Sequence, residues 1–506
     1  MGHMGRKSSK VQALKSSQPS PPTMTTTTIF GPHSTTLGAQ DATRNRLASI
    51  DMQTKNIEVE KASLLSRSEE LDAALKSLQA ERKAIFNRIA PISYLPNEIL
   101  AAIFETLHAS LEDENTALTT LSEVVVSHVA THWRAVAIKA SKLWTRIKFR
   151  SSQQSIGLLE LYLQRSQRLP IDLFVEIDNS NTDSYNHLIR PHVGRCRHLS
   201  IYTDERADLI KQLNLLSTQS TPFLQSMDLL CSSTWRGLSQ LDSNRPSGGA
   251  PNLSALRVRG VEIEDLFDPL YILQSIRMMW CEQIGPRVLH HAANLTHLTL
   301  AELQIYGGEY QSISTITLPR LLTLSISIRD AEDGALSEFL MALDAPRLEV
   351  LHFCNIGETD TSPLWTSTHF PSLHILALDH DLSEFGLLAL ATNCPHITHL
   401  AYGDKVEDLQ LLLKSSRVES GAQTATHWPN LHTLYLDTPS APGAVVEMLI
   451  ARRNIGAPIR KLLVPIKVSL DFHAACSGHV EVERMRDHLK ALYPNWQDWN
   501  SGKWAD

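Results

Sequence analysis

The sequence predicts an α/β protein, in which a long N-terminal helix and a small helical domain precede an irregular solenoid of parallel strands alternating with helices. Three observations predict this fold. Residues 44–89 contain neither glycine nor proline, which suits one long helix. Residues 91–149 carry apolar side chains at helical spacing. From residue 196 onward a single strand-like apolar pattern recurs along the chain.

The N-terminal 90 residues divide into two segments. Residues 1–43 are rich in Ser, Thr, Pro and Lys, so we expect a disordered tail. Residues 44–90 are expected to form the long helix, with apolar residues every seven positions: Ile50, Ile57, Leu64, Leu71, Leu78 and Ile85. A coiled-coil seam needs two apolar positions in each heptad. The second of these positions is mixed here, since it holds Leu47, Leu75 and Ile89 but also Thr54, Lys61, Ser68 and Arg82. A coiled coil with a partner and a lever leading into the next domain both remain open.

Residues 91–149 are expected to form a small domain of short amphipathic helices. Pro96 suits the start of a helix, and Glu98 faces the positive end of the helix dipole. One apolar face follows, made by Ile99, Leu100, Ile103 and Phe104. A second helix is expected over residues 124–140, with Val125, Val129, Trp133, Val136 and Ala137 on its apolar face. A unit this small needs a partner surface.

This domain resembles an F-box. The resemblance rests on Leu95-Pro96-x-Glu98-Ile99-Leu100-x-x-Ile103-Phe104, on Val126-Ser127-x-Val129 before Trp133-Arg134, and on Leu143-Trp144. It is closest to the F-box-like proteins abundant in mushroom-forming fungi. Ala130 stands where a cysteine is common and Ser141 where a proline often occurs. The alternative is an ordinary helical hairpin whose tryptophans belong to the core.

The resemblance implies a substrate receptor of an SCF-type ubiquitin ligase. In that family the F-box docks on a Skp-family adaptor, which connects to a cullin scaffold and a RING subunit. The receptor makes no covalent bond itself, so we do not expect an enzyme. The residues expected to form or support the adaptor-binding face are Leu95, Pro96, Ile99, Leu100, Ile103, Phe104, Val129 and Trp133.

Residues 150–479 carry the repeated pattern. Residues 171–177 alternate as in a strand, and a pattern apolar-x-x-apolar-x-apolar then occurs eleven times at intervals of 20 to 34 residues, beginning at Cys196, Leu224, Leu253, Leu273, Leu295, Leu321, Leu348, Leu373, Ile397, Leu431 and Ile459. Helices are expected between strands, for example over 334–343 and 383–392. These periods resemble leucine-rich repeats, whose units stack into a solenoid. The usual turn asparagine is missing, so the repeats are irregular; the alternative is a mixed α/β domain whose strands share a motif.

The last segment, residues 480–506, is expected to contain a helix over 481–492 that caps the final repeat. Trp496, Trp499 and Trp504 follow it among Asp and Asn residues. A short peptide motif for another protein is the alternative for this tail.

An unknown protein substrate is expected to contact side chains that lie beside the apolar strand positions. Six residues stand at such positions, next to an apolar residue of the strand pattern: Arg257, Arg259, His352, Asp379, Tyr435 and Asp437. A second functional hypothesis is a non-degradative interaction scaffold that uses the repeat surface and the N-terminal helix. Whether cullin and RING subunits co-purify with the protein distinguishes the two.

Composition and motifs exclude several other classes. A net charge of −7 without a basic run argues against nucleic acid as a partner, and no apolar stretch reaches the length of a membrane span. Six dispersed cysteines without a close pair indicate a reduced, cytoplasmic and/or nuclear protein. No catalytic motif, cofactor motif or zinc-ligand spacing is present. His297, His352, His374, His399 and His432 all fall at variable positions of the strand motif, so no metal site is expected.

Overall fold

The structure is a computed structural model of the 506-residue chain. It describes residues 36–89, 91–110, 122–150, 156–177, 182–205, 207–209, 211–212, 219–232, 250–260, 270–279, 289–305, 315–331, 334–354, 369–379, 384–403, 409, 412–413, 416–417, 425–437 and 442–485. The chain divides into two units, residues 1–93 and residues 94–506. Each unit is described by itself.

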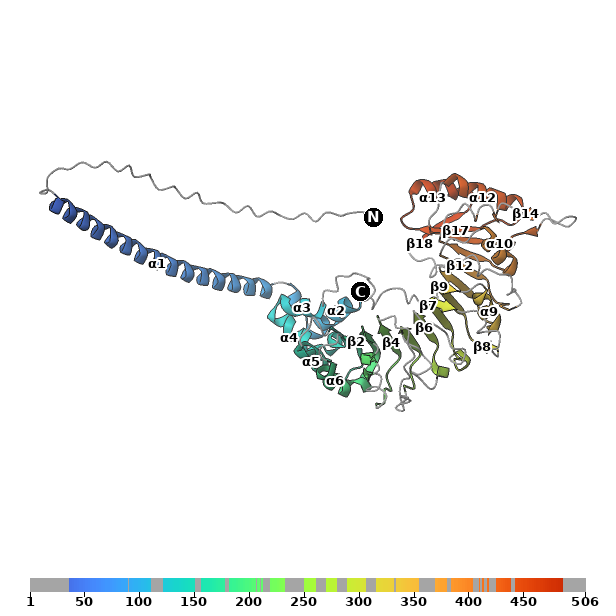
Figure 1. The fold of residues 1–506 in the computed structure, drawn as a ribbon, viewed down its shortest axis with the longest axis horizontal. Coiled ribbons are helices and arrows are strands. Elements are labelled where there is room, and N and C mark those ends of the chain that lie inside the picture. The colour runs from blue at the N-terminus through green and yellow to red at the C-terminus, as the bar shows by residue number, and fades with distance from the viewer. Residues whose placement is uncertain are drawn as a thin grey trace. The chain divides into compact units, whose positions relative to one another are not determined.

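The first unit consists of the helix α1, Thr36–Ile89, which is drawn in blue in Figure 1. The helix begins at Thr36, so the segment 36–43 that was expected to be disordered is helical; residues 1–35 lie outside the described residues. The six apolar residues of the first heptad seam are all about half exposed or more, from 49% for Ile50 to 65% for Ile57. Within its own unit this seam therefore has no packing partner among the described residues.

The second unit opens with a helical domain made of α2 (Asn97–Ser110), α3 (Ser122–Val129), α4 (Thr131–Lys139) and the 3₁₀ turn η2 (Ser141–Trp144). The single helix expected over residues 124–140 is wrong, because Ala130 takes an extended conformation (φ −152°, ψ 159°) and separates α3 from α4. Since the chain direction changes at Ala130, side chains before and after it do not share the helical face that a continuous helix would give them.

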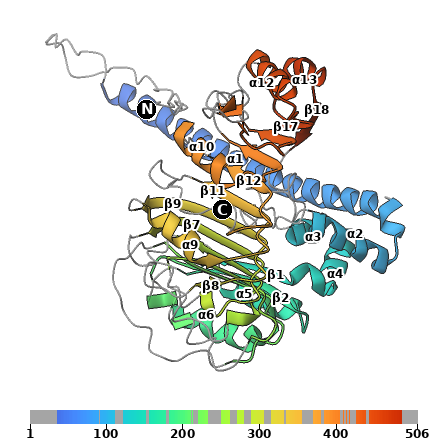
Figure 2. The same ribbon diagram turned by 90° about the vertical axis from the view of Figure 1, so that its right-hand side faces the viewer.

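A single parallel sheet of 14 strands dominates the second unit, and its strand order follows the chain order. The α/β class, the long N-terminal helix and the large parallel sheet with helices are therefore confirmed. Figures 1 and 2 show the strands following one another in a row. The strands are β1 (Arg146–Arg150), β2 (Ile171–Ile177), β3 (Cys196–Thr203), β4 (Ser226–Cys231), β5 (Ala255–Arg259), β6 (Ser275–Met279), β7 (His297–Ile305), β9 (Thr323–Ala331), β11 (Val350–Cys354), β12 (Ile375–Leu378), β13 (His399–Tyr402), β16 (Thr433–Leu436), β17 (Lys461–Pro465) and β18 (Glu481–Met485).

Each of the eleven predicted repeat patterns coincides with one strand, from β3 to β17, and residues 171–177 form β2. The strand β1 was not predicted. The helix expected over residues 481–492 is wrong for its first part, because Glu481–Met485 form the last strand, β18; residues 486–506 lie outside the described residues. Two short pairs, β8 (Ile316–Thr317) with β10 (Leu343–Asp344) and β14 (Ser416–Arg417) with β15 (Ala425–Thr426), stand apart from the main sheet.

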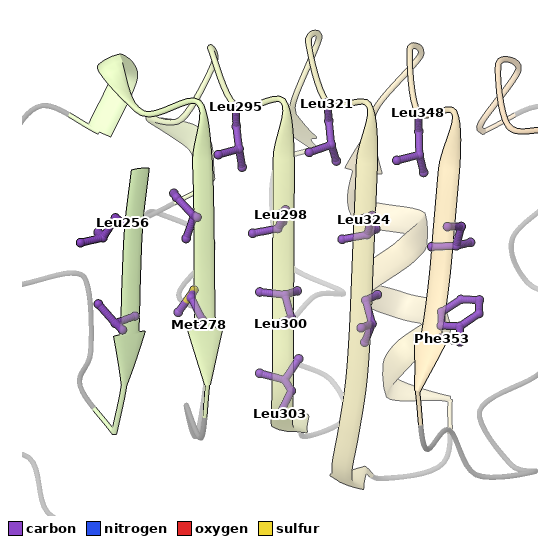
Figure 3. Packing of buried hydrophobic residues seen from close by; sticks show 14 of the residues in the cluster. Leu256, Met278, Leu295, Leu298, Leu300, Leu303, Leu321, Leu324, Leu348 and Phe353 are labelled. Carbon is purple, nitrogen blue, oxygen red and sulfur yellow. The ribbon is translucent and has the colours of Figure 1, made fainter. Parts of the chain in front are cut away.

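The main core lies between one face of this sheet and the helices that connect its strands. Figure 3 shows the repeated apolar positions as rows across neighbouring strands, with Leu298 beside Leu324 and with Leu295, Leu321 and Leu348 in the turns that precede the strands. The connecting helices are α5 (Ile156–Arg165), α6 (Thr182–Ile189), α9 (Ala335–Ala342), α10 (Glu384–Asn393), α12 (Pro442–Asn454) and α13 (Leu470–Ser477). Burying the repeated apolar rows is the largest stabilising contribution to such a sheet.

The other face of the sheet carries the variable positions of the pattern, and we call it the ladder face. Because side chains alternate along a strand, Leu351 and Phe353 of β11 join the main core, whereas Val350 belongs to a separate cluster with Ile375 and Tyr435. In-register pairing brings residues from neighbouring repeats side by side on this face.

Two further expectations concern cysteines and membranes. Five of the six cysteines lie in the described residues, and all five are free thiols, four of them buried. None of the helices in the described part of the chain combines the length and the apolar character that a bilayer crossing needs.

Candidate functional site

A small aromatic and aliphatic core holds the helical domain together. Leu100 and Phe104 of α2 are buried, and the Phe104 ring lies 5.0 Å from the ring of Trp133. The indole nitrogen of the buried Trp144 donates a 2.8 Å hydrogen bond to the carbonyl of Ala137. Leu100, Phe104 and Trp133, all predicted as adaptor-binding residues, therefore support the surface of the domain more than they form it.

The same helices expose a second set of apolar side chains. On α2, Ile99, Ile103 and Leu107 are exposed by 50%, 43% and 43%, and their spacing of four residues puts them on one side of the helix. On α3, which packs against α2, Val125 and Val129 are about half exposed. We call these five residues the apolar face. Exposed apolar side chains on two helices that pack together are typical of a protein-binding surface.

The predicted residues Leu95 and Pro96 directly precede α2. Leu95 is partly buried and Pro96 is exposed, and the Pro96 carbonyl accepts a 3.1 Å hydrogen bond from the Leu100 amide. Pro96 thus caps the helix that carries Ile99 and Ile103. Sequence reasoning missed Leu107, although it lies four residues after Ile103.

Val125 was assigned to the wrong face, together with Trp133 and Val136. Its neighbour Val126 is buried, while Val125 is exposed. The break at Ala130 explains the error, because the periodicity was carried across a point where the helix ends.

A hollow of about 320 Å³ lies over the first strands of the sheet. Strands β1 to β5 supply its lining, which includes both predicted arginines, Arg257 and Arg259. The charged side chains of the lining are four cations and one carboxylate, namely Lys148, Arg150, Arg257, Arg259 and Glu176. Such an excess of positive charge favours an acidic ligand.

One ion pair and mutual repulsion act on the cations of the hollow. Arg150 forms a 2.9 Å ion pair with Glu176. Burial, followed by repulsion from Arg146 and Arg150, lowers the pKa of Lys148. A negatively charged ligand would relieve this repulsion, since an opposite charge stabilises the cationic form.

Arg257 belongs to a buried row of charges on the ladder face. It lies in register between Asp228 of β4 and Arg277 of β6, and all three side chains are buried. Burial raises the pKa of Asp228 to about 6, although both arginines act in the opposite direction. Asp228 therefore offsets part of the positive charge beside the hollow.

The other four predicted substrate residues lie elsewhere on the ladder face. Tyr435 is buried and donates a 3.0 Å hydrogen bond to Asp437, so these two residues of the β16 region pair with each other. His352 is only 2% exposed and contacts Asp379. The six predicted residues thus fall at three separate places, and among them the two arginines line the hollow.

His352, Cys354 and Asp379 form a compact polar cluster. The Nε2 atom of His352 lies 2.7 Å from Oδ2 of Asp379 and 3.1 Å from Sγ of Cys354. The Cys354 thiol also donates to Asp379 Oδ2 at 3.4 Å. Burial and then Asp379 raise the pKa of this thiol. The sequence does not point to Cys354, because ligand motifs are recognised by spacing along the chain and these residues meet across neighbouring strands.

Three histidines follow one another across adjacent strands. The ring of His399 lies 6.3 Å from that of His374 and 4.9 Å from that of His432. Burial, reinforced by His432, His374 and Lys461, lowers the pKa of His399 to about 4. We call these three residues the histidine ladder, and its central ring is held neutral near pH 7.

Comparison with known proteins adds no assignment. No protein-family model matches this chain, and no curated protein matches it.

Proposed function

We propose that this protein is the substrate-recognition subunit of an SCF-type ubiquitin ligase. In this proposal residues 91–149 are an F-box-like domain that binds a Skp-family adaptor, and through it a cullin and a RING subunit. The parallel sheet is a leucine-rich-repeat-like solenoid that binds a protein substrate. The receptor itself makes no covalent bond; it raises the local concentration of the substrate near the ubiquitin-conjugating enzyme.

The observation that carries the proposal is the apolar face beside the Leu95-Pro96 motif. Ile99, Ile103 and Leu107 remain outside the core although Leu100 and Phe104 of the same helix are fully packed. A helix that has already buried one apolar stripe gains nothing in folding from a second exposed one. The second stripe is accounted for if a partner protein covers it, and central apolar residues contribute most to such an interface.

The adaptor proposal is tested by changing Ile103 to Glu in the full-length protein. A charge in the apolar face should reduce co-purification of the Skp-family adaptor, the cullin and the RING subunit at least about tenfold, a change of ~1.4 kcal/mol. The matched control is Ile450→Glu in α12, where an isoleucine of similar exposure, 40%, lies far along the chain. Wild-type adaptor recovery with the Ile103 variant would refute this docking surface.

We further propose that the hollow over β1–β5 binds an acidic segment of the substrate. Its support is the excess of cationic side chains in the lining and the presence there of Arg257 and Arg259. Electrostatic complementarity of this kind contributes most to association rate and specificity.

A non-degradative scaffold is the second candidate. The specific observation in its favour is the exposed seam of α1, with Ile57, Leu64 and Leu78 all more than 60% exposed. A scaffold would recruit partners through α1 and the ladder face without a cullin or RING subunit. If the adaptor co-purifies but those two subunits do not, the scaffold replaces the ligase proposal.

A further inference from the structure

His352, Cys354 and Asp379 bring three different metal-ligand atoms to one point. One ligand atom from each residue lies within 4.8 Å of the other two. The imidazole is buried and the carboxylate is 32% exposed. The cluster lies on the ladder face, at the ends of two neighbouring strands.

Strand register explains why these residues meet. His352 and Cys354 are two positions apart on β11, so both side chains leave on the ladder face. Phe353 pairs with Leu378 of β12, and the amide of Asp379 donates a 3.0 Å hydrogen bond to the carbonyl of Phe353. Asp379 therefore stands beside Cys354 as its neighbour across the strands.

The next strand leaves room for this arrangement. The chain continues from β13 into Gly403, whose amide donates a 2.7 Å hydrogen bond to the Leu378 carbonyl. A Cβ at Gly403 would lie 2.9 Å from the Cα of Asp379, closer than two such carbon atoms can pack. The glycine thus permits the close backbone approach that sets the position of Asp379.

The cluster does not have the geometry of a Cys–His–Asp catalytic relay. In a relay the nucleophile and the carboxylate contact opposite nitrogens of the imidazole. Here Asp379 Oδ2 lies 2.7 Å from Nε2, and Cys354 Sγ lies closer to Nε2, at 3.1 Å, than to Nδ1, at 3.7 Å, while Nδ1 lies 3.0 Å from the hydroxyl of Ser325. The sulfur and the carboxylate oxygen thus share Nε2 as their nearest ring nitrogen, as two ligands of a metal ion bound at Nε2 would.

We propose that His352 Nε2, Cys354 Sγ and Asp379 Oδ2 bind a zinc ion, with a fourth position left for water or a group of a partner molecule. Thiolate, imidazole and carboxylate are the ligands zinc takes in proteins. Bond lengths of 2.0 to 2.3 Å place tetrahedral ligand atoms about 3.3–3.6 Å apart. The present separation of 2.7 Å between Nε2 and Oδ2 would need to widen by about 0.6 Å and those of 3.1 and 3.4 Å by less. The Cys354 sulfur, now 3.7 Å from Nδ1, would also need to move toward the Nε2 end of the ring.

Ser325 completes the site as a positioning residue. A metal at Nε2 requires the imidazole to carry its proton on Nδ1, and the Ser325 hydroxyl is there to accept it at 3.0 Å. Such an outer hydrogen bond fixes the tautomer and the ring orientation of a histidine ligand. The binding step replaces the thiol proton of Cys354, which leaves to solvent, with the metal ion.

Cobalt titration of the chelator-treated full-length protein tests the proposal. Co²⁺ is a spectroscopic substitute for Zn²⁺, and a thiolate-to-cobalt charge-transfer band reports the sulfur ligand even though the chain has 22 histidines. We expect one equivalent of this band in the wild type, none in Cys354→Ser, and a full band in the control Cys231→Ala on β4. Ser325→Ala should weaken cobalt binding about 10- to 100-fold.

A second measurement avoids the variants altogether. In the wild-type protein, Zn²⁺ should protect Cys354 from alkylation, and a chelator should remove the protection, as read by mass spectrometry of the peptide. Absence of the charge-transfer band in the wild type, the same band in Cys354→Ser, or alkylation of Cys354 that zinc does not slow would each overturn the site. These measurements involve no adaptor, so they succeed or fail independently of the ligase proposal.

Discussion

Tyr162 in α5 donates a 2.6 Å hydrogen bond to the carboxyl group of Glu123 in α3. Both side chains are buried, and the contact joins the helical domain to the first connecting helix of the sheet. Burial and then Glu123 raise the pKa of the Tyr162 phenol. Ser122 is a second donor to Glu123, at 3.2 Å. A buried carboxyl group needs such donors, because burial removes its water.

We expect Tyr162→Phe to lower the free energy of unfolding by about 1–3 kcal/mol, since the substitution leaves a buried acceptor without one of its donors. Urea denaturation measures this change. In a Glu123→Gln background the same substitution should cost less, and equal costs in both backgrounds would show that the bond does not explain the effect.

A second prediction concerns Arg452, which is fully buried in α12. Its guanidinium donates 2.8 Å hydrogen bonds to the carbonyls of His427 and Trp428, and burial lowers its pKa to about 10. Arg452→Ala should destabilise the protein by about 3 kcal/mol or more, because it removes two buried hydrogen bonds to carbonyls and creates a cavity. Arg453→Ala, at the exposed neighbouring position, should change stability by less than about 1 kcal/mol. Thermal and urea unfolding of both variants check the contrast.

The histidine ladder predicts a loss of stability in mild acid. The pKa of His399 is about 4 in the folded protein and near 6.5 in the unfolded chain. Between these values the unfolded chain binds more protons, so stability is full above about pH 6.5 and falls as the pH decreases toward 4. Because the ring is partly exposed, we expect a loss on the order of 1 kcal/mol for this residue.

Unfolding free energies at pH 7, 6 and 5 measure this dependence. His399→Gln should flatten it, whereas His396→Gln, at an exposed position in the preceding turn, should leave it unchanged. An identical slope for wild type and His399→Gln would contradict the assignment to the ladder.

A fourth prediction concerns the hollow. Arg259→Glu reverses one of its four cations and should weaken binding of an oligoglutamate peptide about tenfold, or ~1.4 kcal/mol. Fluorescence anisotropy at two salt concentrations measures this binding, which should also fall with added salt. Arg347→Glu changes an exposed arginine that does not line the hollow and serves as the control. Unchanged peptide binding in Arg259→Glu would exclude the hollow as the acidic-ligand site.

The repeat strands could be predicted from the sequence because each one carries three core residues at fixed spacing, as in Leu348, Leu351 and Phe353. The edge strands could not. β18 reads Glu-Val-Glu-Arg-Met, whose side chains favour a helix, and its strand conformation comes from pairing with β17. Tertiary pairing overrides local preference at such positions.

The proximity of Cys354 and Asp379 in the polar cluster with His352 could not be predicted from local sequence either. Cys354 and Asp379 are 25 residues apart, and nothing near either one indicates a ligand. Each, however, directly follows the last apolar residue of its repeat, Phe353 or Leu378. Aligning the repeats strand by strand would have placed the two side by side. The hollow needed more than this alignment, since Lys148 and Arg150 come from β1, which carries no repeat pattern.

The strand order of the main sheet has a mechanical consequence. Each strand pairs only with the strands before and after it in the sheet, so a force pulling on the C-terminal edge would act on one pair of strands at a time. We expect the sheet to unzip from β18 inward in discrete steps. A repeat of about 25 residues would release roughly 80–90 Å of extended chain in each step, a length that optical tweezers resolve.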